Sequence, residues 1–73
     1  MKIKLAKKET IHFIGIGGIG MSGLSLIMKG QGFKVQGSDI VDNKNIDRLR
    51  KEKIKIYLNQ TKNNLKNATI VVI

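Results

Sequence analysis

The sequence predicts an α/β domain with a Rossmann-like parallel sheet and helices on both faces, truncated after about four strands. Three observations predict it. Short apolar runs alternate with helical patterns, the runs at 10–16 and 68–73 are almost continuously apolar, and a glycine turn, residues 15–20, joins the first run to the first helix. Alternating strands and helices form parallel sheets whose strands are covered on both faces. We expect the strand order 3-2-1-4, with the first and last strands central.

The first half of the predicted domain is a strand, a helix and a second strand. Residues 10–16 form the first strand, and the apolar side chains after the glycines recur at helical spacings, which predicts a helix over 18–29. Gly-Gln-Gly at 30–32 ends that helix, because glycine readily adopts the left-handed conformation at a helix C-terminus. The second strand is expected over 33–37.

The second half continues the alternation. A short helix is expected over 45–52, and the alternating pattern of 54–58 predicts a strand with one exposed face at a sheet edge. A helical turn is expected around Leu65. Residues 68–73 predict a central buried strand, and nothing follows in the sequence to cover it. Because whole proteins avoid bare apolar strand edges, we expect the chain to be a fragment of a longer protein.

Composition narrows the function classes. The chain has 73 residues, so residues 10–73 are expected to form one incomplete domain behind a flexible basic lead-in, residues 1–9. The absence of Cys excludes disulfides and thiolate metal sites. The net charge is +9, but no aromatic residues interleave with the cations to stack bases, so we expect no nucleic-acid partner.

The weakly polar run over 11–28 has the length of a short membrane-spanning segment. Glycines recur within it between residues 15 and 23, and each costs a helix up to about 1 kcal/mol relative to alanine. His12 also lies in the run. We therefore expect no membrane partner and a cytoplasmic location.

The glycine turn reads Gly-Ile-Gly-Gly-Ile-Gly and fits G-x-G-x-x-G between a predicted strand and a predicted helix. We predict that Gly15 permits the tight turn, that Gly17 lets the backbone approach a diphosphate, and that Gly20 lets the helix lie close against the strand. Gly18 adds a second bare position. The N–H groups of the first helical turn and the helix dipole would face the anion.

An acidic residue follows the second strand, as nucleotide binding requires. Asp39 can accept hydrogen bonds from ribose hydroxyls, and Ser38 beside it can donate or accept. Ser22 could touch a phosphate or satisfy the helix backbone. The structural alternative is that the glycines make only a tight joint and that Asp39 is a helix-cap or turn residue.

Other candidates for chemistry are few. His12 is the single histidine and lies in a predicted buried strand, so we expect a hydrogen-bonded structural role for it and no metal site. The sequence contains no G-x-x-x-x-G-K-[ST] loop and no nucleophile–base set. Neither ATP binding nor catalysis is expected of these residues.

Two segments together closely resemble the amino-terminal domain of the Mur ligases. They are His12 to Gly23, HFIGIGGIGMSG, and Gly37-Ser38-Asp39, and the similarity covers residues 10–73. The resemblance implies a domain that binds UDP-N-acetylmuramate, with the diphosphate on the glycine turn and the uridine end near Ser38 and Asp39. The candidate contacts with the substrate nucleotide are Gly15, Gly17, Gly18, Ile19, Gly20, Met21, Ser22, Ser38 and Asp39.

The resemblance also implies a reaction for the full-length protein, an ATP-dependent ligase of peptidoglycan biosynthesis that supports cell-wall biogenesis, cell shape and cell division. With ATP and magnesium, an acyl phosphate would form on the lactyl carboxylate, and L-alanine would displace phosphate from it. These steps need a central ATP-binding domain and a carboxy-terminal domain, which the sequence lacks. We expect residues 10–73 to bind substrate without catalysing, to hold no cofactor, and to have the remaining ligase domains as partners.

Two alternatives stay open. The same turn and Asp39 could hold NAD in an oxidoreductase, with the acid selecting a free 2′-hydroxyl. A related ligase, which recycles cell-wall tripeptide onto the same nucleotide sugar, shares much of this segment. Asn59-Gln60 stands where the family often has Gly-His, so the role of that loop is open.

Overall fold

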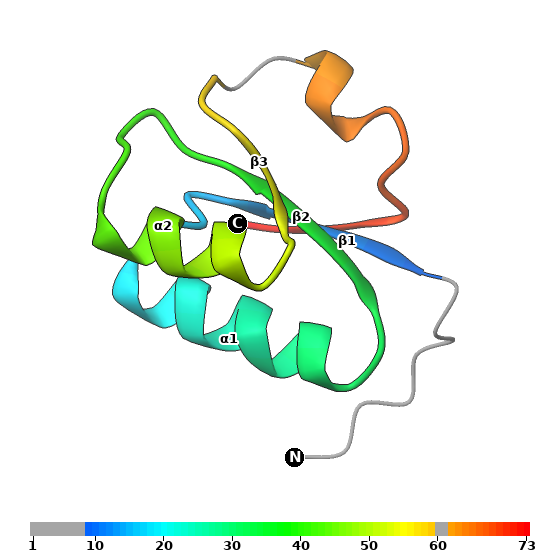
Figure 1. The fold of residues 1–73 in the computed structure, drawn as a ribbon. Coiled ribbons are helices and arrows are strands. Elements are labelled where there is room, and N and C mark those ends of the chain that lie inside the picture. Colours follow the sequence, from blue (N-terminus) through cyan, green and yellow to red (C-terminus); the bar gives the residue numbers. More distant parts are fainter. Residues whose placement is uncertain (1–8, 60–61) are drawn as a thin grey trace.

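A computed structural model describes residues 9–59 and 62–73 of the chain, in which strands and helices alternate as predicted (Figure 1). The elements are β1 (Thr10–Ile14), α1 (Ile19–Gly30), β2 (Lys34–Ser38), α2 (Lys44–Lys51), β3 (Lys55–Tyr57), the 3₁₀ helix η1 (Lys62–Leu65) and β4 (Ile70–Val72). The first strand ends two residues earlier than predicted, because Gly15 and Ile16 already belong to the turn. The predicted lead-in falls outside the described residues except for Glu9, as does Gln60.

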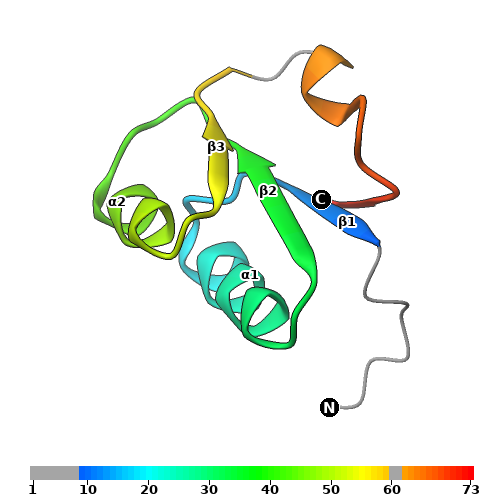
Figure 2. The same ribbon diagram turned by 45° about the vertical axis from the view of Figure 1, so that its right-hand side comes forward.

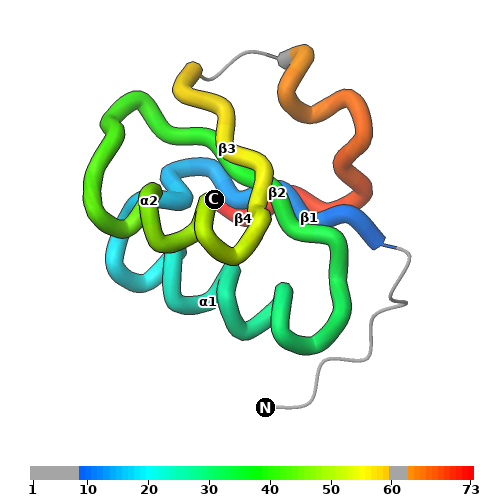
Figure 3. The backbone as a smooth tube through the Cα atoms, viewed as in Figure 1, coloured from blue at the N-terminus to red at the C-terminus, as the bar shows by residue number. Residues whose placement is uncertain are grey.

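The four strands form one parallel sheet in the predicted order β3-β2-β1-β4. In register, Phe13 of β1 lies beside Gly37 of β2 on one side and Val72 of β4 on the other. β3 forms an edge, as predicted, whereas β4 lies beside β1 at the opposite edge (Figure 3). The expected central position of β4 refers to the longer protein and stays a prediction; none of the described residues pairs with the other side of β4, and Val71 is 42% exposed.

The two α-helices lie together on one face of the sheet, and η1 lies on the other (Figure 2). Alternate strand residues such as Ile11 and Phe13 point into the core, where they are buried with Ile46 and Leu49 of α2. The prediction of helices on both faces is confirmed, although the second face is covered only by the short η1. No helix in the described part of the chain combines the length and apolarity needed to cross a membrane.

The end of α1 confirms the role predicted for glycine there. Gly32 has φ +94°, in the left-handed region that a glycine adopts without strain. The N–H of Gly32 donates to the carbonyl of Lys29 at 3.0 Å, and the N–H of Phe33 donates to the carbonyl of Met28 at 3.2 Å. This closure satisfies the last helical carbonyls and directs the chain into β2.

Candidate functional site

The glycine turn connects β1 to α1 at the carboxyl end of the sheet. Gly15 has φ +76°, which confirms that the tight turn needs a glycine here. The N–H groups of Gly15 and Ile16 both donate to the carbonyl of Ser38, at 2.8 and 3.1 Å. These two hydrogen bonds attach the turn to the last residue of β2. The turn itself follows β1, the strand beside β2.

Gly17 is held from both sides by residues that follow β2. Its N–H donates to Oδ2 of Asp39 at 2.8 Å, and its carbonyl accepts from Nδ2 of Asn45 at 2.9 Å. A Cβ on Gly17 would lie 2.8 Å from the same Asp39 oxygen and 3.1 Å from Cδ1 of Ile46. The bare position expected to admit a diphosphate is instead filled by these protein atoms, because the loop after β2 packs directly on the turn.

The Asp39 carboxylate braces the backbone with both of its oxygens. While Oδ2 accepts from Gly17, Oδ1 accepts from the N–H groups of Ile40 and Val41 at 2.8 and 3.2 Å. The carboxylate thus performs the turn role that the sequence left as an alternative. Contact with a ribose stays a prediction, and the half-buried position of Asp39 leaves part of its side chain open to a ligand.

Replacing Asp39 with alanine is expected to lower the free energy of unfolding by about 1–3 kcal/mol, since the buried N–H of Gly17 would lose its acceptor. The Asp39→Asn variant keeps an amide oxygen that can accept from Gly17 and should lose less. Urea unfolding of the two variants checks this. Wild-type stability in Asp39→Ala would show that the carboxylate does not support the turn.

The N-terminus of α1 is open. Its N-cap is Gly18, which makes no side-chain capping bond, and the first turn contains no acidic residue. Gly18, Ile19 and Gly20 are all exposed, and Ile19 is 88% exposed. A Cβ on Gly20 would meet nothing within 4 Å, so the expectation that Gly20 allows close helix–strand packing is wrong. The first-turn N–H groups and the positive end of the helix dipole are thus accessible to an anion.

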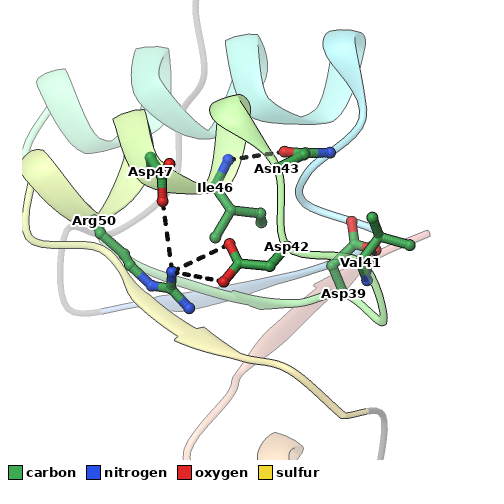
Figure 4. A network of polar contacts seen from close by, with 7 residues as sticks. All are labelled: Asp39, Val41, Asp42, Asn43, Ile46, Asp47 and Arg50. Carbon is green, nitrogen blue, oxygen red and sulfur yellow. Dashed lines mark hydrogen bonds and ion pairs between the residues drawn. The ribbon is translucent and has the colours of Figure 1, made fainter.

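The N-terminus of α2 is closed by the chain itself. The side chain of Asn43 accepts from the N–H of Ile46 at 3.0 Å, and Asp47 lies in the first turn. Arg50 donates to both Asp42 oxygens at 3.2 Å and lies 3.7 Å from Asp47 (Figure 4). These exposed ion pairs contribute little energy each, but with the cap they fix the loop between β2 and α2.

The remaining predicted contacts are less accessible. Met21 packs partly buried against the core. Ser22 is fully buried, and its hydroxyl donates to the carbonyl of Ile19 at 3.1 Å, which is the backbone role allowed for it above. Ser38 is 2% exposed and lies 3.2 Å from Nε2 of His12, whose predicted hydrogen-bonded, buried position is confirmed. Direct contact of Met21, Ser22 or Ser38 with a ligand stays a prediction.

Two residues of this region, Asn43 and Asn45, were not singled out by the sequence. The cap residue Asn43 carried a readable signal, an Asn three positions before the first apolar residue of a helix. Asn45 carried none, and Gly37 was quoted only within the family resemblance, without a structural role. The roles of Asn45 and Gly37 depend on contacts with the glycine turn that join distant parts of the chain. Among residues 9–59 and 62–73, no group of three or more His, Cys, Asp or Glu side chains could hold a metal ion.

A parallel sheet whose central strand runs through a glycine turn into an uncapped helix defines the class of Rossmann-like domains. Comparison with known proteins narrows the class. Residues 10–73 match the Mur ligase family, catalytic domain. The chain belongs to the Mur ligase family.

Curated relatives agree with the family match. The chain is 70% identical over 73 residues, 100% of its length, to the UDP-N-acetylmuramate–L-alanine ligase of Pelagibacter ubique (strain HTCC1062), of which it covers 16%. It is 59% identical over 64 residues, 88% of its length, to the ligase of the same name from Rickettsia prowazekii (strain Madrid E), covering 13% of that protein. The chain therefore spans less than a fifth of the length of these relatives.

Proposed function

We propose that the chain is the UDP-N-acetylmuramate-binding part of a ligase that joins L-alanine to this nucleotide sugar in peptidoglycan biosynthesis. The observation that carries the proposal is the 70% identity, over the whole chain, to a relative with that name. The chain covers only 16% of that relative, so acyl-phosphate formation with ATP and magnesium and the attack of L-alanine are assigned to residues elsewhere in the full polypeptide. The remaining ligase domains are then its partners.

The open end of α1 supports a diphosphate site. The exposed residues Ile19 and Gly20 offer backbone N–H groups without a side-chain cap or a competing carboxylate. The N–H groups of Gly17 and Gly18 do not contribute, because Asp39 and the carbonyl of Gly15 already accept their hydrogen bonds. The uridine end would extend toward Ser38 and Asp39, since the turn is attached to the end of β2.

The alternatives receive less support. A dinucleotide-binding oxidoreductase would use the same turn, but the family match over residues 10–73 is to ligases. The tripeptide-recycling ligase shares the nucleotide sugar, whereas the relatives reported above are named as the alanine ligase. The alanine ligase is therefore the function that the comparisons favour.

An amide NMR titration of the ¹⁵N-labelled chain with UDP-N-acetylmuramate, with NAD as the parallel control, tests the proposal. Shifts confined to Gly18–Ser22 and to Ser38–Asp39, and produced only by the UDP-sugar, are expected. Shifts produced by NAD alone would overturn the proposal in favour of the oxidoreductase. If the chain does not fold by itself, the same titration is made on the full polypeptide.

A further inference from the structure

A buried polar cluster, made of His12, Gln36, Ser38 and Asn64, lies between the sheet and η1, on the face opposite the two α-helices. Nδ1 of His12 lies 2.8 Å from Nε2 of Gln36, and Nε2 of His12 lies 3.2 Å from Oγ of Ser38. Nε2 of Gln36 also donates to the backbone carbonyl of Asn64 at 2.8 Å. Gln36 of β2 thus joins η1 to the imidazole of β1, and the imidazole in turn contacts Ser38 at the end of β2.

The hydrogen-bond partners fix the protonation of the imidazole. The Asn64 carbonyl can only accept, so the Gln36 amide must turn its nitrogen toward it, and the second N–H of that nitrogen points at Nδ1 of His12. Nδ1 must therefore accept, and the ring is neutral with its proton on Nε2. That proton is donated to Ser38, which leaves the Ser38 hydroxyl hydrogen free for another acceptor.

The Ser38 end of this chain of hydrogen bonds meets the glycine turn. Its carbonyl accepts from the N–H groups of Gly15 and Ile16, while its hydroxyl accepts from His12. The next residue, Asp39, holds the N–H of Gly17. A change in the protonation or position of the His12 ring would therefore reach the turn through Ser38.

We propose that His12 is a positioning residue of the nucleotide site: its neutral ring, ordered by Gln36 and Asn64, holds Ser38 and through it the glycine turn in the form that binds the UDP-sugar. The ligand in this inference rests on the proposed function. The control of the turn by His12 rests on the contacts alone. His12 has no hydrogen-bond contact with the turn itself among the described residues, so it acts through Ser38.

Protonation of the ring would break this arrangement. A second N–H on Nδ1 would face the Gln36 amide nitrogen, so either Gln36 leaves the Asn64 carbonyl or the ring leaves Ser38. Among the described residues, no carboxylate forms an ion pair with the ring. Tyr57 of β3 stacks on the ring at 6.3 Å, with Nζ of Lys55 5.5 Å from the Tyr57 ring, and the register partner on β4 is Val71.

Burial accordingly lowers the pKa of His12 from its ordinary value of 6.5. Because the pKa is lower in the folded state, the unfolded chain binds more protons as the pH falls below about 6.5. The ordered turn is therefore complete above that pH and is lost progressively as the pH falls toward the folded pKa. Affinity for the UDP-sugar should follow the same curve.

The test measures the dissociation constant for UDP-N-acetylmuramate between pH 5 and 8 on the full polypeptide, for the wild type and three variants. His12→Gln keeps an amide N–H that can donate to Ser38 but does not titrate. His12→Leu removes the donor. Ser25→Ala is the matched control, because it deletes an equally buried hydroxyl, bonded to the Ser22 carbonyl at 2.7 Å, outside the cluster.

The wild type and Ser25→Ala are expected to lose affinity between pH 7.5 and 5.5, by at most about tenfold, which is the loss that one imidazole titrating at its ordinary pKa of about 6.5 would give. His12→Gln should stay within about threefold of the wild type at pH 7.5 and show a flat profile. His12→Leu should bind about tenfold more weakly at every pH. Wild-type affinity and pH profile in His12→Leu would overturn the inference.

A ligand-free measurement separates this inference from the proposed function. The amide shifts of Gly15 and Ile16, which donate to Ser38, should follow the titration of the His12 ring nitrogens in the wild type and stay constant in His12→Gln. If the wild type binds no UDP-sugar at any pH, the proposed function is wrong, and these shifts still decide the role of His12. Amide shifts of Gly15 and Ile16 that stay constant while His12 titrates would contradict that role.

Discussion

Replacing Gly37 with alanine is expected to lower the free energy of unfolding by about 3 kcal/mol, a large part of the stability of a small domain. A Cβ on Gly37 would lie 2.7 Å from Cβ of Ile16 and 2.8 Å from the backbone oxygen of Phe13. Phe13 is the register partner of Gly37 in the central strand, so its carbonyl cannot move without disturbing the sheet. Ile16 is fully buried, and its displacement would lift the glycine turn from the core.

The Gly23→Ala variant is the matched control for this prediction. Gly23 lies inside α1, and a Cβ there would meet nothing within 4 Å. The same added methyl should therefore stabilise the chain, by up to about 1 kcal/mol, because alanine favours a helix interior over glycine. Urea unfolding of both variants measures the two changes in the free energy of unfolding. A Gly37→Ala midpoint at or above that of the wild type would mean that Ile16 does not pack over β2.

The alternation of apolar patterns was enough to predict the fold class and the edge position of β3, and the strand order followed from the order typical of this fold class. The fold class and the edge position depend on the local period of burial, which residues such as Ile54 and Ile56 record in the sequence itself. The central position of β4 stays a prediction. A continuous apolar run indicates that a strand can be covered on both sides, and the described residues supply a neighbour, β1, on only one side of β4.

The candidate site was predicted in its outline but not in its internal contacts. The motif identified the conformation of Gly15, because a positive φ is a local property. The reason given for Gly20 was wrong, and the contacts that surround Gly17 were not foreseen, since both depend on which atoms approach from elsewhere. Asp39 reaches Gly17 across 22 positions of sequence, and nothing approaches Gly20 within 4 Å. Contacts of this kind become visible only when β2 is placed beside β1.

The open space at Gly20 makes a sharp test of the diphosphate site possible. The Gly20→Asp variant is expected to bind UDP-N-acetylmuramate about 100-fold more weakly than the wild type. At about 5 Å and an effective dielectric constant of about 20, one added negative charge repels the nearer charge of a diphosphate by about 3 kcal/mol. A loss of this size corresponds to about two powers of ten in the dissociation constant.

The same substitution should leave the fold intact or make it more stable. A Cβ at this position would meet nothing within 4 Å, and a carboxylate in a first helical turn interacts favourably with the helix dipole by about 0.3–1 kcal/mol. Gly20→Asn, which has nearly the same volume without the charge, is the control and should lose much less affinity. Calorimetric binding and thermal unfolding of the pair therefore separate charge from shape. A carboxylate at this helix end is expected to stabilise the protein but to repel a bound anion. Unchanged affinity in Gly20→Asp would therefore place the diphosphate away from α1.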